Sequence, residues 1–158
     1  MIATQLNPAL MPVAFLLGTW RGEGEGQYPT IKPFQYREEI RFTHNGKAFL
    51  IYTQRTEAID TGQPMHAEAG YLRLVGEGRV EFVIAQPIGY AEISLGRVDG
   101  RRVDVECANV GRTPTAKPVT AISRSFWMDG DTLRYEVKMG LDGAPASRHL
   151  AASFRRSD

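Results

Sequence analysis

The stretch DGDTLRYEVKM, residues 129–139, decides the fold class of this chain. In it Leu133, Tyr135, Val137 and Met139 alternate with charged side chains, so one face of an extended segment is apolar and the other is solvated. The preceding Asp-Gly-Asp is a turn sequence that joins antiparallel strands. The stretch therefore predicts a half-buried β-strand that follows a hairpin turn.

The same alternation of turn and strand repeats along the whole chain. Sixteen glycines and nine prolines separate runs rich in β-branched and aromatic residues, which is typical of an all-β fold. Ten strands are expected: residues 19–27, 35–43, 48–57, 65–75, 79–86, 90–98, 102–109, 119–128, 132–139 and 146–156, with residues 110–118 as the longest irregular stretch. An open sheet would leave two exposed edges, so the pattern favours a closed, ten-stranded antiparallel up-and-down β-barrel.

A short N-terminal helix is the only helix that the sequence predicts. Asn7 is a suitable N-cap, Pro8 occupies the first helical position, and Gly18 ends the segment. We expect this helix to plug one end of a barrel like those of lipocalins and fatty-acid-binding proteins. A barrel of this size also has room for a small ligand inside.

Composition narrows the classes of function. The 158 residues suit a single domain, residues 1–158. The 19 basic and 18 acidic residues give a net charge of +1, which favours neither nucleic acid nor a membrane as a partner. No basic residue precedes Arg21, so a secretory signal is not expected and a cytoplasmic location is. Cys107 is the only cysteine, which excludes an internal disulfide framework and a cysteine-rich zinc site.

The three histidines are the candidate metal ligands, and no two have the spacing of a zinc-binding motif. His44 precedes an Asn-Gly turn and is expected at an exposed hairpin tip. His66 follows a proline-containing turn, and neither is expected to be a ligand. Alternation places His149 on one strand face with the small Ala151 and Ser153, which leaves room for a flat ligand. Alternation does not show which face points inward, so a surface role for His149 stays open.

Glu38 is a charged residue at a position predicted to be buried. It shares a strand face with Tyr36, Ile40 and Phe42, so its side chain is expected to point into the barrel. A buried carboxyl group needs a hydrogen-bonding partner. The sequence contains neither a nucleophile elbow nor a Walker loop, so hydrolases and nucleotide-binding proteins are not favoured.

The first expected strand opens with a motif of spaced glycines, Gly18, Gly22 and Gly24, around Trp20. Openings of this kind recur in lipocalin-like barrels, where the glycine permits a tight entry and the indole packs on the barrel floor. Alone, the motif predicts a structural role for Trp20.

Further blocks accompany this motif in order along the chain: residues 28–31, 33–39, 64–66, 70–73, 114–117 and 149–152, which read YPTI, PFQYREE, PMH, GYLR, PTAK and HLAA. Taken together, the blocks resemble the nitrobindin family, also described as peroxynitrite isomerases. The similarity covers the chain from about Leu16 onward.

The resemblance implies a ten-stranded barrel that carries ferric haem b, an iron cofactor, with His149 as the axial ligand and catalytic centre. Thr30 and Lys117 match positions that contact the haem or its surroundings. The implied activity is isomerisation of peroxynitrite to nitrate, together with nitric oxide binding. Two alternatives stay open: a non-enzymatic carrier of a small apolar ligand, and a nitric oxide sensor or transporter without turnover. External apolar patches on such barrels favour a homodimer over a monomer.

Overall fold

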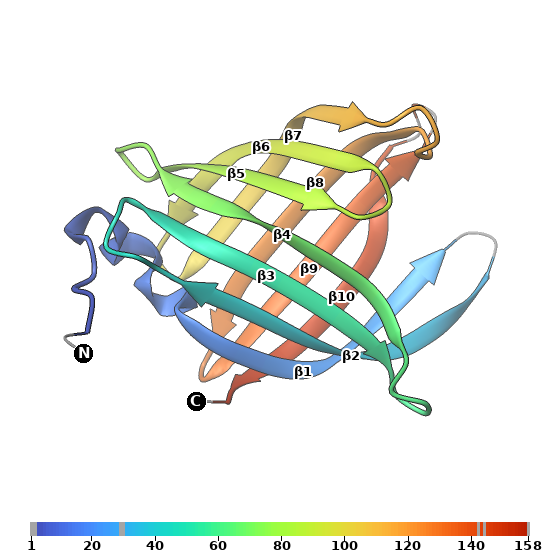
Figure 1. Cartoon of the computed structure of the whole chain (residues 1–158), viewed down its shortest axis with the longest axis horizontal. Helices are drawn as coiled ribbons and strands as arrows, with labels where there is room; N and C mark the ends of the chain where they lie inside the picture. The colour runs from blue at the N-terminus through green and yellow to red at the C-terminus, as the bar shows by residue number, and fades with distance from the viewer. Residues whose placement is uncertain (1–2, 29–30, 142, 144, 158) are drawn as a thin grey trace.

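The computed structural model describes residues 3–28, 31–141, 143 and 145–157, and these form a closed antiparallel barrel (Figure 1). Its strands are β1 (Gly18–Tyr28), β2 (Ile31–Thr43), β3 (Phe49–Ala58), β4 (Pro64–Leu74), β5 (Arg79–Gln86), β6 (Tyr90–Asp99), β7 (Arg102–Arg112), β8 (Val119–Asp129), β9 (Thr132–Leu141) and β10 (Ser147–Arg156). Each strand pairs with its neighbours in the chain, and β1 pairs with β10 to close the ring. The prediction of a ten-stranded up-and-down barrel is confirmed.

Two strands are longer by three or more residues than the sequence predicts. β2 begins at Ile31 rather than at residue 35, because Phe34 and Ile31 continue the pairing with β1. β7 extends to Arg112, because residues 110–112 still pair with the start of β6. The stretch predicted to be irregular, residues 110–118, is therefore only partly a loop.

A short helix, η1 (Pro8–Leu16), closes one end of the barrel, on the left in Figure 1. It is a 3₁₀ helix, and Oδ1 of Asn7 accepts a hydrogen bond of 3.0 Å from the backbone N–H of Ala9, as expected of an N-cap. Its own Leu10, Val13 and Leu16 side chains are fully buried. The predicted plug is confirmed. Among the described residues, no helix is long and apolar enough to cross a membrane.

Trp20 joins this plug to the barrel wall. Its side chain is buried, and Nε1 donates a hydrogen bond of 2.7 Å to the carbonyl oxygen of Leu16. Further along the barrel axis, the rings of Phe42, Tyr52 and Phe126 contact one another at centroid distances of 5.2 to 6.4 Å. The closed end is therefore filled by apolar and aromatic side chains.

Candidate functional site

A cavity of about 690 Å³ lies at the other end of the barrel. Its walls are mainly apolar side chains from the ends of several strands, including Phe34, Met65, Val137, Met139 and Leu150. Its floor is polar, with Gln54, Glu68, Gln86 and Arg124. A concave apolar site with a few polar groups is the usual form of a small-molecule site.

His149 lies in this cavity because the backbone of β10 is irregular at that residue. Arg148 pairs with Lys138 and Leu150 pairs with Val137, so His149 is an extra residue with no opposing residue of its own on β9. Such a β-bulge turns a side chain away from strict alternation. Both His149 and Leu150 therefore line the cavity, although alternation predicts them on opposite faces.

The surroundings of His149 keep its imidazole neutral. Burial lowers the pKa of His149, and the electrostatic effect of the nearby His66 and Arg124 lowers it further. A hydrogen bond to the backbone carbonyl of Gln27, on β1, acts in the opposite direction on this pKa. A neutral imidazole whose ring is oriented by a carbonyl acceptor is the form of histidine that binds metals.

His66 is a second histidine in the cavity, but its ring is held differently. Its Nε2 lies 3.1 Å from Oε2 of Glu68. Burial alone would raise the pKa of Glu68, yet Arg124 and His66 outweigh burial and lower this pKa to about 2. An ionised carboxylate only accepts hydrogen bonds, so Nε2 of His66 carries the proton and donates it. Because Nε2 of His66 is engaged by Glu68, His149 is the better candidate metal ligand of the two.

Arg124 is the centre of the polar floor. Its guanidinium is 2% exposed and contacts Oε1 of Glu68 at 2.5 Å and Oε2 of Glu92 at 2.9 Å. It also donates to the hydroxyl of Tyr135 at 2.5 Å. No role for Arg124, Glu68 or Glu92 follows from the sequence alone, although strand alternation places Arg124 between the inward-facing Ile122 and Phe126. Burial of one cation between two carboxylates fixes all three side chains in one arrangement.

Glu38 adds a protonated carboxyl group beside this polar floor. It is buried, and Gln54 donates a hydrogen bond of 2.8 Å from Nε2 to its Oε1. Burial is the main reason why the pKa of Glu38 rises to about 8. The expectation that Glu38 points inward and has a polar partner is confirmed.

The glycine motif contributes to both ends of the barrel. Gly18 and Trp20 belong to the closed end, away from the cavity. Gly24 lies beside the ring of Tyr36, where an added Cβ would come within 2.6 Å of the ring carbon Cζ. Tyr36 in turn lines the cavity. At Gly22 an added Cβ would meet the backbone of Ser153. These two glycines therefore permit close packing of β1 against an aromatic ring and against β10.

The other predicted site residues are distributed as follows. Lys117 lies in the loop between β7 and β8 and lines the cavity, and its backbone carbonyl accepts a hydrogen bond of 2.7 Å from the hydroxyl of Tyr90. Thr30 lies outside the described residues. His44 does not line the cavity; its Nδ1 accepts a hydrogen bond from the backbone N–H of Gly46 at 3.3 Å.

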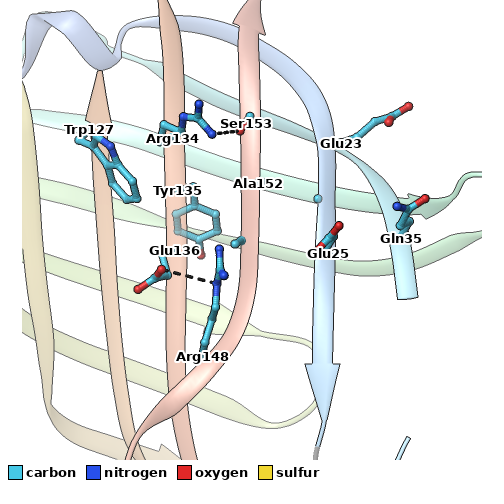
Figure 2. A pocket seen from close by; sticks show the side chains of 12 residues that line it. Glu23, Glu25, Gln35, Trp127, Arg134, Tyr135, Glu136, Arg148, Ala152 and Ser153 are labelled. Atoms are coloured by element: carbon cyan, nitrogen blue, oxygen red, sulfur yellow. Dashed lines mark hydrogen bonds and ion pairs between the residues drawn. The ribbon is translucent and has the colours of Figure 1, made fainter. Parts of the chain in front are cut away.

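A smaller hollow of about 350 Å³ lies against β1, β9 and β10 (Figure 2). Its cations already have partners, because Arg134 donates to Ser153 at 3.0 Å and Arg148 lies 3.6 Å from Glu136. Within the part of the chain that the structure describes, no group of three His, Cys, Asp or Glu side chains could hold a metal ion. The larger cavity around His149 is therefore the candidate site for a ligand.

The chain is similar to known proteins over nearly its whole length. Residues 9–156 match the family model described as THAP4-like, heme-binding beta-barrel domain. A protein of Mycobacterium marinum named Peroxynitrite isomerase 2 is 51% identical over 155 residues, which cover 96% of each chain. A Nocardia farcinica protein named Peroxynitrite isomerase is also 51% identical, over 96% of this chain and 92% of its own.

Among solved structures, the crystal structure of Rv2717c from M. tuberculosis matches with a TM-score of 0.89 and 47% identity. The match covers 98% of this chain and 100% of that one. The resemblance that the sequence blocks indicated is confirmed in both sequence and fold.

Proposed function

Because the chain belongs to the family of THAP4-like, heme-binding β-barrel domains, we propose that it is a haem-dependent peroxynitrite isomerase in which His149 would hold the haem iron. The observation that carries the proposal is the β-bulge that turns a neutral His149 into the apolar cavity. The named relatives supply the substrate and the reaction class.

The residues present suit haem b. A flat macrocycle needs apolar walls, which the cavity has, and one neutral imidazole, which His149 provides. Its propionates need cationic partners near solvent, and the exposed Lys117 at the cavity edge suits this role. We include Thr30 in the proposal as a further contact.

Bound ferric haem would supply a Lewis acid for the peroxide group of the substrate. The chain's own residues prepare the site. The Gln27 carbonyl orients the ring of His149, and the apolar walls exclude water from the cavity. A single protein ligand leaves room for one small molecule, so nitric oxide is proposed as a second ligand. The product proposed for peroxynitrite is nitrate.

A hemin titration followed in the Soret region tests this function. The protein is expected to bind hemin one to one, His149→Ala to lose stable binding, and the control His44→Ala to behave like the parent. Stopped-flow measurements of peroxynitrite decay should then show acceleration by the loaded parent only. Hemin binding and isomerisation that both survive in His149→Ala would contradict the assignment.

A non-enzymatic carrier of an apolar ligand is the second candidate, and the apolar walls of the cavity are the observation that favours it. It predicts tight binding of a fatty acid and indifference to hemin in the same titration. A nitric oxide sensor would bind hemin but would not accelerate peroxynitrite decay.

We also propose a cytoplasmic homodimer. The exposed Tyr71, Val83 and Ile93 lie in register on the outer faces of β4, β5 and β6, and such an apolar stripe suits contact with a second copy. Light scattering after size-exclusion chromatography tests the dimer, and a monomeric mass at micromolar concentration would contradict it.

A further inference from the structure

His66 faces the same cavity as His149 but is not used in the proposed function. Its backbone N–H donates a hydrogen bond of 3.0 Å to Oγ1 of Thr56, which fixes the start of β4 beside β3. Its side chain is 26% exposed and lines the cavity. The ring is therefore accessible to a small molecule in the cavity.

Glu68 holds this ring, and Glu68 is itself held tightly. Its Oε1 accepts hydrogen bonds from the hydroxyl of Tyr52 at 2.7 Å and from Arg124 at 2.5 Å, and its side chain is 3% exposed. Since Oε2 of Glu68 accepts the proton of Nε2, Nδ1 is the basic nitrogen of a neutral His66. Among the described residues, Nδ1 of His66 has no hydrogen-bond partner.

We propose that His66 and Glu68 form a carboxylate–imidazole dyad that serves as the general base of the cavity for small inorganic acids, peroxynitrous acid among them. The inference rests on the proposed function and adds a second functional histidine to it. Orientation of an imidazole by a carboxylate, with the opposite nitrogen facing the reactant, is the arrangement used in general base catalysis.

The proton balance of this step is simple. The bond between the proton and the acid breaks, the electron pair stays on the anion, and the proton forms a bond to Nδ1 of His66. The anion is then available as a ligand, and the new positive charge on the ring lies next to the Glu68 carboxylate, which compensates it.

Arg124, Glu38 and His149, which lie in or near the cavity, are less suited to this role. Arg124 is bound to two carboxylates. Glu38 is a buried acid that carries its own proton near neutral pH, because its pKa is raised to about 8. His149 is the proposed haem ligand. His66 therefore combines a basic nitrogen, access to the cavity and a fixed orientation.

Cyanide binding to the hemin-loaded ferric protein tests the dyad without measuring turnover. Near neutral pH the reagent is mostly hydrogen cyanide, so it must lose a proton to bind as the anion. His66→Gln keeps a polar side chain without a basic nitrogen, and it is expected to slow association about 100-fold. At a pH where cyanide is already the anion, variant and parent should converge. Carbon monoxide binding to the reduced protein, which needs no base, should be unchanged.

The matched control is His44→Gln, whose residue lies outside the cavity. Cyanide association in His66→Gln within about twofold of the parent at neutral pH, or an equal loss for carbon monoxide, would overturn the inference. Failure of the parent itself to bind hemin would instead refute the proposed function, and the two failures are distinct.

A measurement on the haem-free parent covers the case in which His66→Gln does not load hemin. The ¹⁵N chemical shifts of the His66 ring are expected to show a protonated Nε2 and an unprotonated Nδ1. The reverse tautomer would overturn the dyad.

Discussion

The two ends of the barrel differ in what fills them. At the closed end, Leu10, Val13 and Leu16 of η1 pack under Trp20. The hydrogen bonds from the Leu10 backbone and the Trp20 side chain join residues that are close in the sequence. At the open end, buried charges around Arg124 form the floor of a cavity with two histidines. One strand pattern can therefore build a packed core at one end and a polar-floored cavity at the other.

The largest expected effect concerns the buried charges around Arg124. Arg124→Met removes the cation from Glu68 and Glu92 and leaves two buried carboxylates without compensation. We expect it to lower the free energy of unfolding by about 3–5 kcal/mol, measured by urea denaturation of the haem-free protein. The matched control Arg134→Met, on the exposed face of β9, should cost less than about 1 kcal/mol. Similar losses of stability in the two variants would mean that burial of the charges around Arg124 does not increase their effect on stability.

The next effect is a pH dependence that belongs to the open end. Between its ordinary value of 4.5 and about 8, Glu38 is protonated in the folded protein and ionised in the unfolded chain. Folding then takes up a proton, so the free energy of unfolding should fall by up to a few kcal/mol as pH rises through this window. Glu38→Gln should remove this decline.

Glu39→Gln is the control for that measurement. Ion pairs with Arg21 and Arg55 lower the pKa of Glu39 despite partial burial, so its contribution to stability is lost only as pH falls below its ordinary value. Its variant should keep the parent's decline between pH 5 and 8. An unchanged decline in Glu38→Gln would show that another group causes it.

A smaller loss is expected at the closed end. Trp20→Phe leaves a small void and removes the hydrogen bond to Leu16, and together these should cost about 2 kcal/mol in urea denaturation. Hemin affinity should stay within about twofold, since Trp20 does not line the cavity. Trp127→Phe on the barrel wall is the comparison variant. A large drop in hemin affinity with Trp20→Phe would contradict the view that only the open end binds the ligand.

The smallest expected effect is on the stability of His149→Ala. His149 is only half-buried, so its removal should change the free energy of unfolding of the haem-free protein by less than about 1 kcal/mol. A calorimetric comparison with His44→Ala measures this change. A loss of several kcal/mol would assign His149 to the structural part of the barrel.

The fold could be predicted from the sequence because its signals are local. Alternation with a period of two, together with Gly- and Asp-containing turns, locates the strands, and closure follows from the need to avoid open edges. The inward position of Glu38 follows from the same alternation, and the structure confirms it.

The site could be predicted only in part. The bulge at His149 inserts one residue into the β9–β10 pairing, and alternation along a single strand contains no sign of that insertion. The meeting of Glu68, Glu92 and Arg124 depends on how strands far apart in the barrel are staggered, which a linear pattern does not give. His66 and Glu68 share one strand face, as alternation predicts, but the contact of Glu68 with Arg124 depends on the stagger of distant strands.

The pairing of β1 with β10 has a consequence for how the protein is made. The hydrogen bond from Arg156 to Leu17 joins residues 139 positions apart, so this seam forms only after most of the chain has left the ribosome. His149 belongs to the strand that completes the seam, and its carbonyl partner Gln27 belongs to the first strand. A nascent chain therefore lacks the oriented histidine until the ring is shut, and capture of the cofactor is expected to be a late step of maturation.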